Sequence, residues 1–213
     1  MKMCLLLIFL DDSIEWTEDP EVTPGLYQGD IAIDSTMHQY LRVGLKWDTF
    51  QNRMWSNRQI PYVVSPLYNA EEQVVIMMAI RTINFLTCVK FVEWNRNETD
   101  FLLIWPIKHP KGCWSYIGKT GGPQIVSLQP PDHKSQNCLG SEGRALHELM
   151  HAIGIFHEQS RHDRDRFVGL KNGFLSCCSS LCQKGFQKMA LLCNFFLILI
   201  RIGRTCYKSK SHF

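Results

Sequence analysis

The spacing of apolar residues predicts one long helix in the first half of the chain. The stretch NAEEQVVIMMAIRTINFLTC, residues 69–88, carries acidic residues in its first turn, where the helix dipole favours negative charge. Its apolar residues recur three or four positions apart, which is the period of one helix face. They are Ile76, Ala79, Ile80, Ile83 and Leu86. We therefore expect a helix that packs one side against a core.

Short runs of β-branched and aromatic residues predict strands around that helix. The runs are PYVV, VKFVEW, FLLIW and IVSL, at residues 61–64, 89–94, 101–105 and 125–128. Pro61 opens the first run, where its missing N–H group does least harm. A second helix is expected from about Ser141, as N-cap, to Ile153, with Gly154 ending it. Strand, helix, strands and helix in this order describe an α+β domain.

The two ends of the chain depart from this pattern. Residues 1–10 hold one basic residue and a short apolar run, which indicates a short signal peptide; a buried first strand is the alternative. Residues 11–46, here called the leading segment, are polar and lack a long periodic run, so we expect them to lie over the rest of the protein. Residues 189–200 are apolar, but twelve residues are too few to cross a bilayer, and we expect no stable membrane span.

Charge and cysteine content limit the possible partners of the protein and the compartments in which it works. The 23 Lys and Arg residues nearly balance the 20 Asp and Glu residues, and no basic run suggests nucleic acid as a partner. Nine cysteines are many for a chain of 213 residues. Cysteines pair in oxidising compartments, so their number favours a secreted, extracellular protein.

The strongest chemical signal is HELMHAIGIFH, residues 147–157. On a helix, His147 and His151 lie one turn apart on the same face, so both imidazoles can reach one metal ion. Gly154 can adopt a positive φ, which ends the helix and turns the chain so that His157 supplies a third nitrogen. Three nitrogens leave a position for water, as in catalytic zinc sites, and we expect one Zn²⁺ per chain. Three unrelated histidines are the alternative.

Glu148 follows the first histidine directly. It is rotated by about 100° around the helix axis, so it cannot easily join the metal's ligands but can hydrogen-bond a water molecule bound there. This is the position of a general base. The chemistry that these residue types support is hydrolysis of a peptide bond by activated water.

The longer stretch HELMHAIGIFHEQSRHDRD, residues 147–165, resembles the signature of the astacin family of metzincin zinc endopeptidases. WSNRQIPYVV, TCVKFVEW, GCWSYIGKTGG and QIVSL also look like astacin segments and occur in the family's order. The resemblance covers residues 26–168. It implies an N-terminal metzincin-like subdomain over residues 47–168, with a mixed twisted sheet, a core helix and a zinc-binding helix. It also implies zinc ligands at His147, His151 and His157 and a general base at Glu148.

The same resemblance assigns expectations to residues outside the motif. Cys113 and Cys138 would form a disulfide, and the partner of Cys88 would lie far downstream. CWSYIG, residues 113–118, would be the edge strand along which an extended peptide or protein substrate binds. Glu158 would engage a new N-terminus after activation, or it is an exposed carboxylate without a partner.

The leading segment resembles the part of the family that keeps the enzyme latent. LYQGDI, residues 26–31, is similar to the latency motif F-x-G-D, with Tyr27 at the phenylalanine position. Asp30 would then bind the zinc and block it, whereas an ordinary Gly-Asp turn is the alternative. An activating protease would cut after a basic residue, at Arg42 or Lys46.

Beyond Val168 we expect the resemblance to end. Residues 169–213 form a divergent, cysteine-rich tail that lacks the S-x-M-H-Y turn of the family's second subdomain. Two functions therefore compete: a zinc endopeptidase made as a latent precursor, and a catalytically defective zinc-binding fragment that acts only by binding peptides. A third reading, a small protein attached to a membrane by residues 189–200, fails on length.

Overall fold

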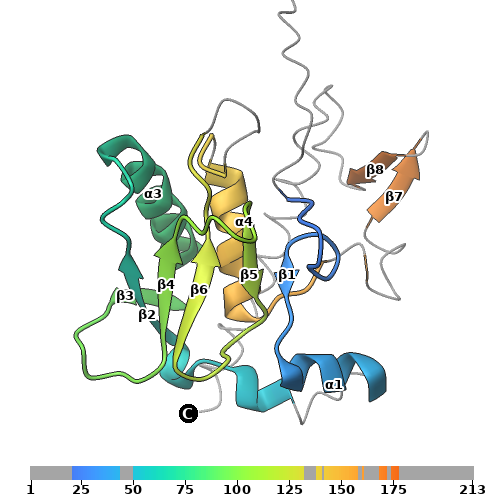
Figure 1. Ribbon diagram of the computed structural model, residues 1–213, viewed down its shortest axis with the longest axis horizontal. Helices are drawn as coiled ribbons and strands as arrows, with labels where there is room; N and C mark the ends of the chain where they lie inside the picture. Colours follow the sequence, from blue (N-terminus) through green and yellow to red (C-terminus); the bar gives the residue numbers. More distant parts are fainter. Residues whose placement is uncertain are drawn as a thin grey trace, which may run out of the picture.

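The computed structural model describes residues 21–43, 50–131, 138–140, 142–157, 160, 168–171 and 174–177 (Figure 1). The predicted signal peptide and most of the predicted tail lie outside these residues. So do Lys46, Ser141 and Glu158, on which the sequence placed a cleavage site, a helix cap and an activation contact.

A six-stranded sheet forms the centre of the described fold (Figure 1). In spatial order its strands are β1 (Ile31–Ala32), β5 (Trp114–Tyr116), β6 (Pro123–Ser127), β4 (Phe101–Trp105), β2 (Gln59–Val64) and β3 (Lys90–Glu93). Within it only β5 and β6 pair antiparallel, so the sheet is mixed, as expected. A separate antiparallel pair consists of β7 (Val168–Lys171) and β8 (Phe174–Cys177).

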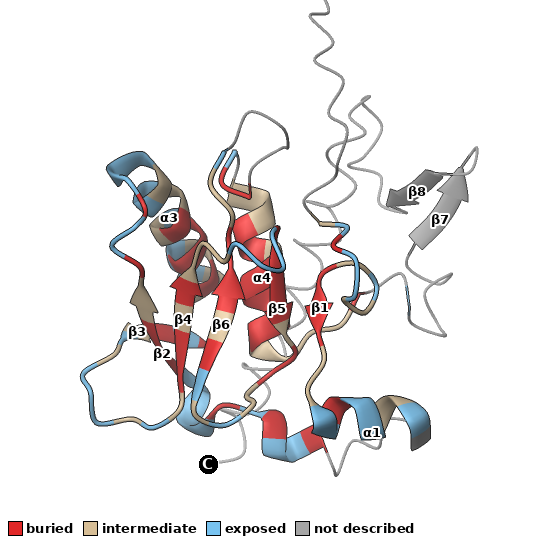
Figure 2. Cartoon of the chain, viewed as in Figure 1, coloured by how far each residue is buried: buried red, intermediate tan, exposed pale blue. Residues whose placement is uncertain are grey.

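Two long helices cover one face of the six-stranded sheet. They are α3 (Ala70–Leu86) and α4 (Glu142–Ile153), which pack against each other, with α4 also contacting β5 and β6. Figure 2 shows buried residues concentrated on the strands and on these two helices. The helices and the mixed sheet together confirm the α+β class.

The helix α3 forms where the apolar pattern predicted it. Asn69 accepts a hydrogen bond from the Glu72 amide, and the Glu72 carboxylate accepts one from the Asn69 amide, so a capping box starts the helix. Four of the five predicted core positions are buried, namely Ile76, Ala79, Ile80 and Ile83. Leu86, at the last position of the helix, is partly buried and packs against the edge of the same core.

The strand β2 begins earlier than the sequence predicted. It starts at Gln59, so Pro61 is its third residue and not its first. The strand tolerates this proline because β4 pairs with β2 only from Tyr62 onward, which leaves β3 as the one neighbour at Pro61. The missing N–H group therefore interrupts no ladder with β4.

A side chain of α3 hydrogen-bonds the backbone of the outer strand β3. The Asn84 side chain, on α3, donates to the carbonyl oxygen of Phe91 at 3.0 Å and accepts from the Phe91 amide at 2.7 Å. One amide group thus replaces a neighbouring strand at this position, which protects the edge against pairing with another chain.

The leading segment contributes elements that the sequence did not predict. Its strand β1 lies parallel to β5, with Ile31 opposite Ser115, and therefore occupies the edge that we expected to be free. The helix α1 (Ser35–Val43) follows. Asp34 accepts a hydrogen bond from the Met37 amide at 2.8 Å, and the Met37 side chain is buried, so capping and burial together stabilise this short helix.

Cysteine pairing agrees with what the resemblance implied for one pair. Cys113 and Cys138 form a disulfide with their Cα atoms 5.6 Å apart. Cys88 is also disulfide-bonded, and the downstream position of its partner stays a prediction. None of the helices in the described part of the chain is long and apolar enough to span a membrane.

Candidate metal centre

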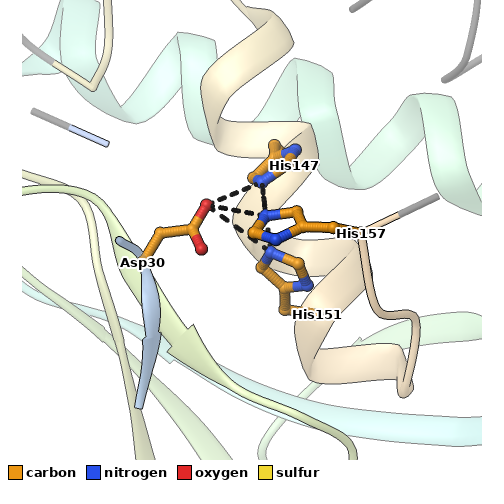
Figure 3. Close-up of side chains that lie close together, drawn as sticks. All are labelled: Asp30, His147, His151 and His157. Atoms are coloured by element: carbon orange, nitrogen blue, oxygen red, sulfur yellow. Dashed lines mark hydrogen bonds and ion pairs between the residues drawn. The ribbon is translucent and has the colours of Figure 1, made fainter. Parts of the chain in front are cut away.

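The end of α4 positions the three histidines of the motif. His147 and His151 project from successive turns of the helix, which ends at Ile153 as predicted. Gly154 follows with φ +119°, and its amide donates to the carbonyl oxygen of His151 at 2.8 Å. This turn reverses the chain and returns His157 to the other two histidines (Figure 3).

The ligand atoms converge on one point (Figure 3). The Nε2 atom of His147 lies 3.1 Å from Nε2 of His151 and 3.2 Å from Nε2 of His157. The Oδ2 atom of Asp30 lies 2.9 Å from Nε2 of His147 and 3.0 Å from Nε2 of His157. Four possible metal ligands thus lie within 4.8 Å of one another.

The spacing of these atoms fits a tetrahedral zinc ion. Bonds of about 2.0–2.1 Å at tetrahedral angles separate neighbouring ligand atoms by roughly 3.3 Å. Imidazole nitrogens and a carboxylate oxygen are also donors that zinc accepts. Without a proton or a cation between them, the lone pairs of three ring nitrogens this close would repel each other.

Hydrogen bonds made by the outer ring nitrogens orient two of the three histidines, His151 and His157. The carbonyl oxygen of Ile155 accepts a hydrogen bond from Nδ1 of His151 at 2.6 Å. Nδ1 of His157 donates to Oε1 of Gln28 at 2.8 Å. In a neutral imidazole, a protonated Nδ1 leaves the Nε2 lone pair free, so both rings direct a lone pair at the centre.

Glu148 is fully buried beside this cluster. Neither of its carboxylate oxygens has a hydrogen-bond partner among the described residues. Burial, and then the nearby carboxylates of Asp30 and Glu21, raise the pKa of Glu148 well above its usual value. A buried carboxyl group that none of the described donors satisfies is suited to receive a proton from a small molecule at the centre.

Asp30 reaches the centre from a tight turn of the leading segment. The backbones of Tyr27 and Ile31 hydrogen-bond each other across this turn, and Gly29 has φ +101°. A Cβ atom on Gly29 would lie 2.6 Å from the carbonyl oxygen of Glu21, so only glycine fits. The Gly-Asp turn and the contact with the histidines therefore coexist and are not alternatives.

The Asp30 carboxylate is held in its charged form. Burial alone would raise the pKa of Asp30, but its close contacts with His147, His151 and His157 outweigh burial and lower it. Burial also lowers the pKa of His151, against the opposing effect of Asp30. Both shifts, that of Asp30 and that of His151, favour the deprotonated form that a metal ligand requires.

Two contacts of this region carry no signal in the sequence. Gln28 binds His157 from 129 positions away. Asp34 forms an ion pair with Arg53 across 19 positions. Asp34 precedes a helix, so its capping role could have been predicted, but nothing in the local pattern indicates its distant partner.

The fold and the site define an α+β domain with a three-histidine group that could hold a metal ion. The chain belongs to the astacin family of peptidases, whose family model matches residues 48–189. The matched range ends inside residues 169–213, where we expected the resemblance to have ended already.

Known relatives match a large part of this chain and a smaller part of their own. Zinc metalloproteinase nas-4 of Caenorhabditis elegans is 38% identical over 160 residues, which cover 73% of this chain and 47% of nas-4. The astacin-like metalloendopeptidase of Mus musculus is 36% identical over 152 residues, covering 71% of this chain and 32% of the mouse protein. The chain thus spans about half or less of the length of these relatives.

Among solved structures, high choriolytic enzyme 1, a hatching enzyme zinc-protease of Oryzias latipes, is 38% identical. The similarity covers 55% of each chain with a TM-score of 0.45.

Proposed function

We propose that the chain is a zinc-dependent endopeptidase of the astacin type, secreted as a latent precursor. One observation carries the proposal: His147, His151 and His157 converge within hydrogen-bond distance beside the fully buried carboxyl group of Glu148, which has no hydrogen-bond partner among the described residues. This combination has a clear use in hydrolysis and no evident structural use. Relatives that bear the name zinc metalloproteinase support the same reaction class.

The three histidines would hold one zinc ion. Zinc bound there would supply a Lewis acid that acidifies water and polarises a peptide carbonyl group. The Nδ1 hydrogen bonds of His151 and His157 keep both rings directed at the centre.

Glu148 would act as the general base. Its carboxylate takes a proton from the attacking water molecule and later donates it to the nitrogen of the leaving amine. Its burial favours this relay, because a raised pKa makes the carboxylate basic enough to accept the proton near neutral pH.

Asp30 and the leading segment would keep the enzyme latent. Asp30 occupies a fourth ligand position, and β1 covers the β5 edge along which a substrate would lie. Cleavage after Arg42, which is exposed in the last turn of α1, or after Lys46 would separate this segment from the protease domain.

The competing function is peptide binding without catalysis. The pairing of β1 with β5 favours it, because an extended segment already adds to this edge as a strand. A zinc-binding fragment that lacks a complete catalytic cleft would retain this property.

Peptide hydrolysis after controlled cleavage of the leading segment separates the two functions. A mixed set of quenched peptides is incubated with the cleaved chain and with its Glu148→Gln variant, and the zinc content of both is measured. We expect about one zinc in each and a fall in turnover of roughly 10²-fold or more in the variant. Two zinc-loaded proteins without hydrolysis would leave only the binding function, and removal of zinc by a chelator should abolish any true activity.

A further inference from the structure

A second carboxylate of the leading segment is bound by a buried arginine of the protease domain. We propose that Arg53 is a carboxylate-binding site whose ligand is Asp34, and that it anchors the leading segment independently of the contact between Asp30 and the histidines. The inference rests on the proposed function in one respect, the identity of residues 11–46 as a segment that is removed on activation.

Arg53 is built into the domain as a fixed, buried cation. Only 4% of the residue is exposed, although it belongs to the short helix η1 (Gln51–Arg53), whose other residues are exposed. Its Nη1 atom donates to the carbonyl oxygen of Ile117 at 3.2 Å. Its Nη2 atom donates to both carboxylate oxygens of Asp34, at 2.5 Å for Oδ2. A buried guanidinium requires such a counter-ion.

The surroundings of Arg53 connect it to the metal centre. Its carbonyl oxygen accepts a hydrogen bond from the Lys119 amide at 2.7 Å. The neighbouring Gly118 has φ +65°, and a Cβ atom there would lie 2.6 Å from that same carbonyl oxygen. The Gly118 amide donates to the carbonyl oxygen of His151 at 2.8 Å. Arg53 is therefore held by the loop that also contacts the backbone of a candidate metal ligand.

Asp34 is equally fixed on its own side. It starts α1 by accepting a hydrogen bond from the Met37 amide, and Met37 itself is buried. Burial would raise the pKa of Asp34, but the hydrogen bonds from Arg53 and Met37 lower it below its usual value. The carboxylate is thus charged and held between a helix N-terminus and a guanidinium, which both favour the anion.

The carboxylates of Asp30 and Asp34 bind different parts of the domain. Asp30 contacts the histidines, and the strand β1 that follows it pairs with β5. Two residues beyond β1, Asp34 contacts Arg53. An ion pair between Glu21 and Arg144 of α4, at 3.0 Å, adds a contact at the other end. Because the Arg53 contact needs no metal, it should hold the leading segment in zinc-free protein as well.

Hydrogen–deuterium exchange of residues 31–43 in the intact, zinc-free chain tests this anchor. Asp34→Asn removes the charge but keeps an N-cap, since asparagine caps helices as well as aspartate. Gln39→Ala, at an exposed position of the same helix, is the matched control. Because Asp34→Asn loses a charged hydrogen bond, residues 31–43 should exchange roughly tenfold faster, or more, than in the parent chain. Their exchange in Gln39→Ala should be unchanged. Exchange within α3 serves as the reference for intact folding.

A double-mutant comparison keeps the test decisive. Arg53→Gln alone should accelerate exchange of residues 31–43, and the pair Asp34→Asn with Arg53→Gln should add little to the larger single effect. Additive effects, or exchange in Asp34→Asn equal to that of the parent chain, would overturn the anchor. Hydrolysis by the cleaved chain is a separate readout: an anchor without any hydrolysis would defeat only the proposed function, and hydrolysis without an anchor would defeat only this inference.

Discussion

Replacing Gly154 by alanine should weaken metal binding through backbone geometry alone. Gly154 has φ +119°, a conformation that side chains with a Cβ atom rarely adopt, and the new Cβ would approach Cε1 of Phe50 to 3.4 Å. Backbone strain of this kind costs about 1–3 kcal/mol. To release this strain, the turn would have to move Ile155 and His157. The carbonyl oxygen of Ile155 holds the ring of His151, and the ring of His157 lies beside that of His147.

The expected result has two parts. The free energy of unfolding of zinc-free protein, measured in denaturant, should fall by about 1–3 kcal/mol. Zinc affinity, measured by competition with a chromophoric chelator, should fall about 10- to 100-fold, because the hydrogen bond that orients His151 and the reach of His157 both depend on this turn.

Gly121→Ala is the matched control for this experiment. Gly121 also has a positive φ, +91°, but nothing lies within 4 Å of its Cβ position, and it sits in a turn before β6. The Gly121→Ala variant should lose about as much free energy of unfolding as Gly154→Ala but should keep the zinc affinity of the parent chain. Equal zinc affinities for the two variants would refute the reasoning that the Gly154 turn positions the ligands.

Three further outcomes follow from the described contacts. Asp34, whose pKa is lowered in the folded state, stabilises the fold fully above its unfolded pKa of about 3.9 and loses this effect as pH falls through the lower folded value. The Asp34→Asn variant should thus be less stable than the parent at pH 7 and nearly equal to it in acid; a difference that does not shrink would contradict the assignment. Ile80→Ala, at a buried core position, should lower the free energy of unfolding by about 2–5 kcal/mol, whereas Met78→Ala, on the exposed side of α3, should change it by less than about 0.5 kcal/mol. Asn84→Ala strips two hydrogen bonds from Phe91 and should cost about 1–3 kcal/mol in the same assay, and an unchanged denaturation midpoint would show that water replaces them at no cost.

Under the proposed function, the occupied β5 edge would couple latency to substrate binding. Ile31 and Ala32 pair with Ser115 and Tyr116, and the Asp30 carbonyl oxygen accepts a hydrogen bond from the Ser115 amide at 3.0 Å. The backbone that pairs with this edge is therefore continuous with the carboxylate that contacts the histidines. Under the proposed function, a single cleavage would free both the metal centre and the strand edge.

Local geometry explains why the sequence alone could predict so much of the centre. His147, Glu148, His151 and His157 lie within eleven positions, and the period of a helix and one glycine turn determine their relative placement. The buried face of α3 follows from the same period. These features depend on residues a few positions away, so the local sequence is enough to predict them.

Only the tertiary structure decided which distant residues complete the site. Asp30 is 117 positions from His147, and its role could be expected from family resemblance but not from any local pattern. The ion pair of Asp34 and Arg53, and the closure of the β5 edge by β1, had no signal at all. Such contacts depend on the order of strands in the sheet and on the path of the leading segment, and these are set by the packing of the whole domain and not by the properties of neighbouring residues.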